Sequence, residues 1–319
     1  MMGLSRNGSR RPRTALVLGA GGIKTVSHIG LFKVLRREGI EIDLVVGSSG
    51  GALFGAAYSI GTDPDVLEQM VRRYWRKELF RDYGYSQLLK MLSPRMFRFD
   101  ENFGVLKGES MQRLLGRMLG RTTFEDLAIP LRVVATDLQT GDAVVLREGS
   151  VAEAIRASIA IPILLPPYRV DGRWLLDGAV SSPLPIEHAI AEGAEVIISM
   201  GFPSALHSRI DGPLRLVTQL MRITGNRLYH AELAYHARNP AIEVVPVEVH
   251  CDANIGMRDV HEIPQLIVAG EEAAERQLDD IRRTLAEFHR PRNRAKRHIR
   301  MSMRRALRTA VAELPPYDR

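Results

Sequence analysis

Short apolar runs along the chain alternate with longer stretches in which apolar residues return every three or four positions. The runs predict strands buried on both faces of a sheet, and the stretches predict helices that each bury one side. We expect strands at Thr14–Leu18, 44–46, 131–136, 143–146, 168–170, 173–176, 195–200 and 242–249. We expect helices after residues 24 and 51 and at 151–159, 186–192, 213–236 and 263–288. This alternation predicts a single α/β domain.

Two glycine-rich turns follow the first two strands. Gly19-Ala-Gly-Gly-Ile-Lys24 follows the first, and Gly47-Ser-Ser-Gly-Gly51 follows the second. The second has the form G-x-S-x-G, in which a serine occupies a sharp turn from strand to helix and flanking glycines leave the necessary room. Ser49 is therefore a candidate nucleophile at a helix N-terminus, where unpaired N–H groups favour developing negative charge. Gly21 and Gly22 can add N–H donors to an oxyanion hole.

A carboxylate stands at the end of the 173–176 strand. Asp177 follows this apolar run and is itself followed by Gly178 and Ala179. The preceding dipeptide Asp171-Gly172 is a strong hairpin signal, because both residues tolerate the backbone of a tight turn. The hairpin would aim Asp177 from the end of its second strand.

Together these residues resemble the patatin-like phospholipase family, and the resemblance covers most of residues 14–200. The oxyanion motif of the family is similar to the first turn, with Gly19, Gly21, Gly22 and Lys24. Its nucleophile motif is similar to the second turn, with Gly47, Ser49, Gly50 and Gly51. Its D-G-G/A motif is similar to Asp177, Gly178 and Ala179. The chain departs from the family at Thr25, where a glycine usually follows the basic residue.

The resemblance implies a three-layer α/β/α fold with a central, mainly parallel sheet. It also implies a Ser–Asp dyad in which Asp177 takes the proton of Ser49 directly, while the N–H groups of Gly21, Gly22 and Gly50 bind the oxyanion. A carboxylate is a weak base for a hydroxyl. We therefore expect Asp177 to be enclosed, which raises its pKa, and to lie within hydrogen-bonding distance of Ser49. The implied activity is hydrolysis of phospholipid or lysophospholipid acyl esters through an acyl-enzyme, without a cofactor or a metal.

Other interpretations of the same residues stay open. His188 follows the acid, as in the usual order of a Ser–Asp–His triad, and predicts an esterase or thioesterase. The strand, glycine turn and helix also resemble the start of a dinucleotide-binding unit, although Lys24 stands where that fingerprint needs its third glycine. A nucleic-acid binder is a further class, and we do not expect it, because the basic residues gather in the tails.

Charge divides the chain into a body and two tails. Residues 1–13 carry four Arg and no acid, and residues 289–319 carry ten Lys or Arg against two acids. The net charge of +7 therefore leaves −5 for residues 14–288. We expect a disordered N-terminus at 1–13, a catalytic domain at 14–288, and a basic tail at 289–319. The tail has helical apolar spacing, which predicts peripheral contact with an anionic membrane; a helix docked on the body and a solvated tail are the alternatives.

The stretch 62–128 predicts helices that form an insertion or cap near the site. They either pack on one face of the sheet or use Met and Phe side chains, Met96 and Phe97 among them, to line an acyl channel or lid. No apolar run reaches the ~20 residues of a membrane span. The single cysteine, Cys251, excludes an internal disulfide framework and fits a reducing compartment. We therefore expect a cytoplasmic protein that associates peripherally with membranes. No His, Cys or carboxylate cluster has the spacing of a metal site.

Overall fold

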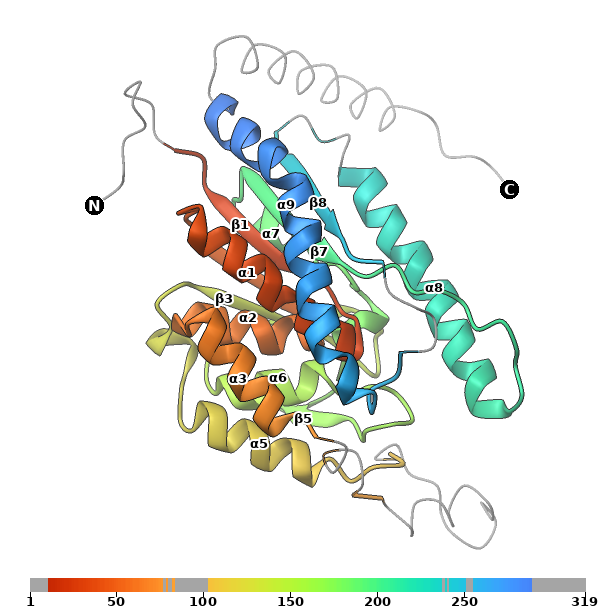
Figure 1. Ribbon diagram of the computed structural model, residues 1–319. Helices are drawn as coiled ribbons and strands as arrows, with labels where there is room; N and C mark the ends of the chain where they lie inside the picture. Colours follow the sequence, from red (N-terminus) through yellow and green to blue (C-terminus); the bar gives the residue numbers. More distant parts are fainter. Residues whose placement is uncertain are drawn as a thin grey trace, which may run out of the picture.

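The computed structural model of the chain describes residues 11–76, 79, 82, 83, 103–236, 239, 241–250 and 255–288. Helices lie on both sides of a central sheet (Figure 1). The strands are β1 (Thr14–Leu18), β2 (Leu44–Ser48), β3 (Leu131–Asp137), β4 (Ala143–Leu146), β5 (Tyr168–Val170), β6 (Arg173–Asp177), β7 (Val196–Gly201) and β8 (Glu243–Glu248). The α-helices are α1 (His28–Arg37), α2 (Gly50–Ile60), α3 (Pro64–Tyr74), α5 (Glu109–Leu119), α6 (Val151–Ser158), α7 (Ile186–Ala191), α8 (Pro213–His236) and α9 (Ile263–Glu287). Within the described residues, the 3-10 turns are η1 (Gly22–Ser27), η3 (Phe124–Asp126), η4 (Gly178–Val180) and η5 (Val260–Glu262).

The sheet is mainly parallel, as predicted. Strands β8, β7, β1, β2 and β3 pair in parallel in that order, and β3 then pairs antiparallel with both β4 and β6. Val134 pairs with Ser48 of β2 and with β4, whereas Ala135 pairs with Asp177 of β6 and with β4. Strands β2 and β6 therefore lie end to end along one edge of β3, with β4 along the other edge. This register brings the end of β2 to the end of β6.

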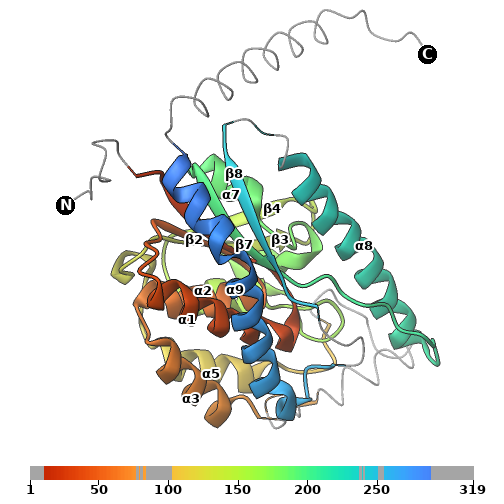
Figure 2. The same cartoon turned by 45° about the horizontal axis from the view of Figure 1, so that its top comes forward.

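Successive side chains of β1 point to opposite faces of the sheet and so enter two separate core clusters. Leu16 and Leu18 pack in the larger cluster with α1, α2 and α9, while Ala15 and Val17 pack in the second cluster with α7 and Tyr229 of α8. All four side chains are fully buried. A strand covered on both faces reads as a continuous apolar run, which is why the sequence predicted it. Helices on both faces make the three-layer α/β/α arrangement (Figure 2).

Local signals in the sequence set the turns between elements. Asp63 caps α3, since its carboxylate accepts a hydrogen bond from the N–H of Asp65 at 2.8 Å. In the β5–β6 hairpin, Asp171 and Gly172 both have positive φ, at 49° and 82°. Two successive left-handed residues are the backbone of a type I′ turn, so the hairpin predicted from Asp171-Gly172 is confirmed.

Helices α1 and α9 cross at two glycines that the sequence analysis did not single out. A Cβ on Gly30 would lie 2.8 Å from the carbonyl carbon of Gly270, and a Cβ on Gly270 would lie 2.9 Å from the Cα of Ser27. The missing side chains let α9 approach α1 and η1 closely along this face (Figure 1). The last described helix is thereby fixed to the element that follows the first strand.

The N-terminal boundary of the body needs a correction. Residues 11–13 were expected to belong to a disordered arm, but the Arg11 guanidinium donates to both carboxylate oxygens of Asp43, at 2.6 and 2.7 Å. The N–H of Arg13 donates to Glu195 at 2.9 Å. Composition alone suggested a solvated arm, because the acids that hold it lie far along the chain. The expectations for residues 1–10 and for the tail at 289–319 lie outside the described residues.

In the stretch 62–128, α3 packs against α1 and α5 packs against α6. Met96, Phe97 and most of the segment 77–102 lie outside the described residues, as does Cys251. In the part of the chain that is described, no helix is long and apolar enough to cross a membrane.

The α1–α9 crossing generates a stability prediction. Gly270→Ala places a methyl group against Ser27, so we expect it to lower the free energy of unfolding by about 1–3 kcal/mol. Gly116→Ala is the matched control, because it also lies within a helix but nothing lies within 4 Å of the new methyl group. We expect the control to be neutral or to stabilise by up to about 1 kcal/mol, because alanine loses less backbone entropy. Urea unfolding measures both, and equal effects would contradict the close crossing.

Candidate active site

Ser49 occupies the sharp turn between β2 and α2. Its backbone has φ 55° and ψ −127°, a strained conformation for a residue with a side chain, of the kind that costs about 1–3 kcal/mol. A Cβ on Gly47 would lie 2.6 Å from the Cα of Ala52, and a Cβ on Gly51 would lie 2.6 Å from the carbonyl carbon of Leu18. Only glycine fits at these two positions, as the G-x-S-x-G spacing predicted.

Ser158, at the end of α6, holds this turn in place. Its hydroxyl accepts a hydrogen bond from the N–H of Ser49 at 2.8 Å and donates to the carbonyl of Val134 at 2.6 Å. All three residues are buried. An unpaired N–H in such a site costs about 1–3 kcal/mol, so Ser158 offsets part of the cost of the turn.

Asp177 faces Ser49 from the end of β6. The Ser49 hydroxyl donates to Oδ2 of Asp177 at 2.7 Å, and the N–H of Ala179 donates to Oδ1 at 2.8 Å. Asp177 is 3% exposed. Burial raises its pKa to about 6, against the opposing effect of the hydrogen bonds from Ser49 and Ala179. The enclosure and distance agree with the expectation from the sequence.

The backbone of Asp177 is fixed on both sides. Its N–H donates to the carbonyl of Ala160 at 3.0 Å, and its carbonyl accepts from the Thr136 hydroxyl at 2.9 Å. The next residue, Gly178, sits where a Cβ would lie 2.6 Å from the hydroxyl oxygen of Ser48. Glycine at this position lets the end of β6 approach the end of β2. The carboxylate is therefore positioned by the sheet itself and not by a loop.

The first glycine turn lies against the start of α2. Gly22 has φ 60°, and its carbonyl accepts a hydrogen bond from the Thr25 hydroxyl at 2.6 Å. A Cβ on Gly50 would lie 2.9 Å from the Cβ of Thr25. Thr25, the residue at which the chain departs from the family motif, thus packs between the two turns. Gly50 is the first residue of α2, so its N–H has no carbonyl one helical turn earlier.

The other motif residues surround these two turns. The N–H of Gly19 donates to the carbonyl of Met200 at 2.8 Å, which anchors the start of the first turn. Lys24 is buried at 5% exposure and lines a cleft together with Gly21 and Ala179. The structure therefore brings the residues of all three motifs to one region, at the ends of β1, β2 and β6.

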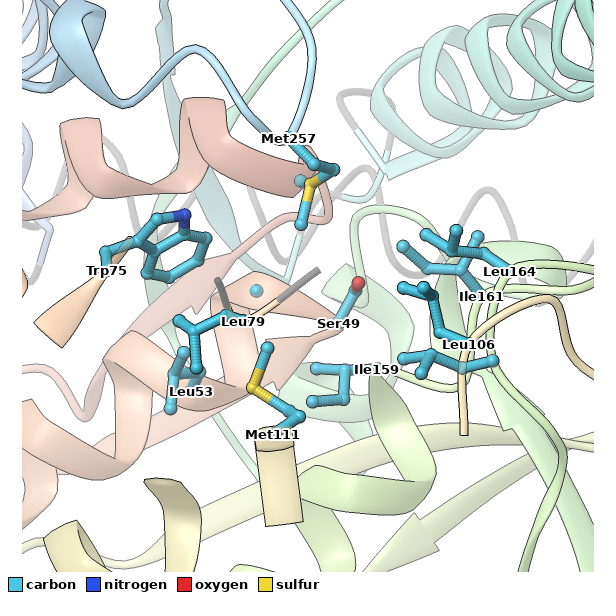
Figure 3. A pocket seen from close by; sticks show the side chains of 13 residues that line it. Ser49, Leu53, Trp75, Leu79, Leu106, Met111, Ile159, Ile161, Leu164 and Met257 are labelled. Atoms are coloured by element: carbon cyan, nitrogen blue, oxygen red, sulfur yellow. The ribbon is translucent and has the colours of Figure 1, made fainter. Parts of the chain in front are cut away.

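An apolar pocket opens on one side of Ser49. Its walls come from α2, from the residue after α3, from α5 and the segment before it, and from the segment after α6. They include Leu53, Trp75, Leu106, Met111, Ile159 and Leu164. The Ser49 hydroxyl points toward the space between these side chains (Figure 3). The pocket holds about 40 Å³, so a long acyl chain fits only if flexible side chains such as Met111 and Met257 move.

An open cleft of about 530 Å³ lies on the other side of Ser49. It is lined by Gly21, Lys24, Asp177, Phe202, Met221 and Asn226, among others. The cleft and the apolar pocket share Gly22, Ser49, Ile161 and Met257. Ser49 therefore stands at the junction of a closed apolar space and a larger space that also has polar walls.

His188 is not positioned as a triad histidine. It lies in α7, where its Nε2 is 3.6 Å from Oε1 of Glu187. Both carboxylate oxygens of Asp177 are occupied, by Ser49 and by Ala179, so no imidazole stands between the serine and the acid. Burial also lowers the pKa of His188. Within the described part of the chain, no group of three His, Cys, Asp or Glu side chains could hold a metal ion.

Sequence reasoning missed the residues that support the site. Ser158 and Thr136 act through hydrogen bonds to Ser49 and Asp177, and both lie in ordinary helix and strand patterns. Ser158 belongs to the segment Arg156-Ala-Ser-Ile-Ala-Ile-Pro162, which is similar to the segment that precedes the aspartate in the family, and this was the one available signal. Their roles depend on which elements become neighbours.

Comparison with known proteins defines the class. Residues 16–190, more than half of the chain, match the family Patatin-like phospholipase. The chain belongs to this family, and both the predicted family and the predicted α/β fold are confirmed.

Relatives place this domain in longer proteins. The chain is 35% identical over 208 residues to an uncharacterised NTE family protein of Mycobacterium tuberculosis, covering 65% of this chain and 53% of that protein. It is 31% identical over 188 residues to the human patatin-like phospholipase domain-containing protein 6, covering 58% of this chain and 13% of that protein. The chain thus spans about half the length of the mycobacterial relatives it matches.

Solved structures also match over most of the chain. VipD from Legionella pneumophila covers 87% of this chain and 69% of its own, with 13% identity and a TM-score of 0.46. Human GIVD cytosolic phospholipase A2 covers 86% of this chain and 60% of its own, with 11% identity and a TM-score of 0.48.

The buried carboxylate of Asp177 generates a prediction about stability and pH. Its pKa is about 6 in the folded chain, against an ordinary value of 3.8, so the folded state binds the proton more tightly than the unfolded state. The tighter proton binding adds its full amount to the free energy of unfolding below pH ~3.8. This contribution is lost as pH rises through ~6, and above that pH the buried charge costs on the order of 3 kcal/mol of stability. Asp177→Asn removes the charge and can keep both hydrogen bonds.

We therefore expect Asp177→Asn to raise the melting temperature at pH 8 and to raise it much less at pH 4. Thermal unfolding by circular dichroism at both pH values measures the difference. Asp142→Asn, a change in the exposed β3–β4 turn, is the matched control and should follow the wild type at both pH values. A variant with lower stability than wild type at pH 8 would contradict the cost of burying Asp177.

Proposed function

We propose that this chain is a serine lipid acyl hydrolase that cleaves carboxylic esters of phospholipids or lysophospholipids with a Ser49–Asp177 dyad. One observation carries the proposal: a serine hydroxyl at a strained turn donates directly to a buried carboxylate, where an apolar pocket meets an open cleft. Membership of the patatin-like phospholipase family supports the same class of reaction.

In the first half of the proposed reaction, Asp177 takes the Ser49 proton as the serine oxygen attacks the ester carbonyl carbon. The raised pKa of about 6 leaves Asp177 ionised at neutral pH and makes it a stronger base than an exposed aspartate. Negative charge develops on the former carbonyl oxygen. The N–H groups of Gly21, Gly22 and Gly50 would stabilise it, with the N-terminus of α2 adding its dipole.

In the second half, the tetrahedral intermediate collapses and the ester C–O bond breaks. Asp177 returns its proton to the departing alkoxide, which leaves as an alcohol, and the acyl group stays on Ser49. Water then gives a proton to Asp177 and attacks the acyl carbon. A second collapse returns the proton to Ser49 and releases the carboxylic acid.

The two cavities divide the proposed substrate. The apolar pocket, lined by Trp75, Leu106 and Met111, suits an acyl chain. The open cleft suits the remainder of the lipid, since Lys24 and Arg222 line it and would favour an anionic head group. The stretch 62–128 would thus act as a wall of the acyl site, and a lid role for it stays a proposal.

The rival functions have less support. A Ser–His–Asp esterase would need His188 beside the dyad, and a dinucleotide-binding protein would have no use for a serine paired with a carboxylate.

Labelling with a fluorophosphonate probe tests the nucleophile. We expect the wild type to be labelled and to release fatty acid from a panel of phospholipids and lysophospholipids. Ser49→Ala should lose both, because it removes the hydroxyl that donates to Asp177. Ser48→Ala is the matched control and should still be labelled, since the side chain of Ser48 is fully buried. An unlabelled wild type would contradict the proposal, and so would His188→Ala losing activity as completely as Asp177→Ala.

The pH profile tests the base. Because Asp177 must be ionised to accept the Ser49 proton, we expect kcat/KM to fall below a pKa of about 6 and to level off above it. Well below the pKa the loss should approach ~tenfold per pH unit. Initial rates on a monomeric ester between pH 4.5 and pH 8, each about 1–2 units from the pKa, measure this. A profile that stays flat down to pH 4.5 would show that the base is not Asp177.

A further inference from the structure

An unusual number of apolar side chains are exposed on α8 and on the segment before it. Leu206 and Ile210 precede the helix, and Leu216, Leu220 and Ile223 lie on it, each between 40% and 54% exposed. We call these five side chains the α8 face. Leu216, Leu220 and Ile223 stand at positions i, i+4 and i+7, so they share one side of the helix. An exposed apolar patch of this kind marks a site of interaction.

The α8 face borders the open cleft. Val217, Met221 and Gly225, on the neighbouring side of the same helix, line the cleft that reaches Ser49. Helix α8 lies at the edge of the molecule, where it contacts α7 and η4 (Figure 2). Whatever covers the α8 face is therefore next to the mouth of the cleft.

Charge identifies the kind of surface that would cover it. Residues 203–228 carry four Arg and one Asp, a net charge of +3. Residues 14–288 together have a net charge of −5, so the rest of the body carries −8. Exposed apolar side chains among arginines, on an otherwise acidic body, are the composition of an element that lies on anionic lipid. A symmetric contact with a second copy would instead bring two basic faces together.

We propose that the α8 face docks on anionic lipid surfaces and thereby sets the cleft mouth against the membrane. The inference rests on the proposed function for its choice of a lipid partner. Leu216, Leu220 and Ile223 enter the apolar part of the interface, while Arg209, Arg215 and Arg227 lie near the head groups. A substrate lipid then reaches the cleft without first crossing water.

Vesicle binding by the full-length chain tests the proposal. The protein carries Ser49→Ala, so vesicle binding is measured without hydrolysis. A loss of binding is therefore distinguishable from a lack of the proposed hydrolase activity. The vesicles are phosphatidylcholine alone or phosphatidylcholine mixed with phosphatidylglycerol. We expect Leu220→Asp with Ile223→Asp to weaken binding to the mixed vesicles by roughly tenfold or more, because two apolar side chains leave the interface and two charges enter it.

A matched double variant controls for surface charge. Val66 on α3 and Val268 on α9 are 47% and 53% exposed, away from the α8 face. Val66→Asp with Val268→Asp should bind as the parent does. Circular dichroism checks that both double variants fold. Equal binding by the two double variants would overturn the proposal, as would a parent protein that prefers pure phosphatidylcholine.

Hydrogen exchange locates the contact and separates it from any contribution of the tail at 289–319. With mixed vesicles, we expect amides within 205–228 to exchange more slowly. Slower exchange confined to other segments would overturn the proposal. Light scattering without lipid tests whether a second copy of the chain covers the α8 face instead. If the parent is a dimer and Leu220→Asp with Ile223→Asp converts it to a monomer, the face belongs to a dimer interface and lipid docking is overturned.

Discussion

The end-to-end placement of β2 and β6 on one edge of β3 is the constraint on which the site depends. Val134 and Ala135 are adjacent residues, and they pair with Ser48 and Asp177 respectively. The serine that leaves β2 and the carboxylate that ends β6 are therefore set opposite each other by hydrogen bonds of the sheet. Rigid strands position such groups more accurately than loops do. The 2.7 Å contact between Ser49 and Asp177 follows from this register.

The site itself is costly to fold. It combines a strained serine, a buried carboxylate and glycines that give up backbone entropy. Each cost has a local compensation. Ser158 satisfies the N–H of Ser49, Thr136 holds the backbone of Asp177, and both faces of β1 are filled by apolar side chains. Such a balance is typical of functional sites, where strain persists because the surrounding structure fixes it.

The site also sits between different environments. The apolar pocket and the open cleft meet at Ser49. Helix α8 lines the cleft with Val217 and Met221 and exposes apolar side chains on another side. In the proposed reaction, Ser49 would thus attack an ester whose acyl chain enters the apolar pocket, with movement of its flexible side chains, and whose head group lies in the cleft. Residues 203–228 carry a net charge of +3, whereas the rest of residues 14–288 carries −8.

The sequence by itself determined the elements and the residues of the motifs. Buried strands, the glycines around Ser49 and the Asp171-Gly172 hairpin are local patterns, so their positions were readable without knowledge of the fold. Tertiary structure decided the rest, because it depends on contacts between distant segments. Four features leave no periodic signal in the sequence. They are the position of β6 beyond the end of β2, the hydrogen bonds from Ser158 and Thr136, the ion pair of Arg11 with Asp43, and the crossing of α1 and α9 at two glycines.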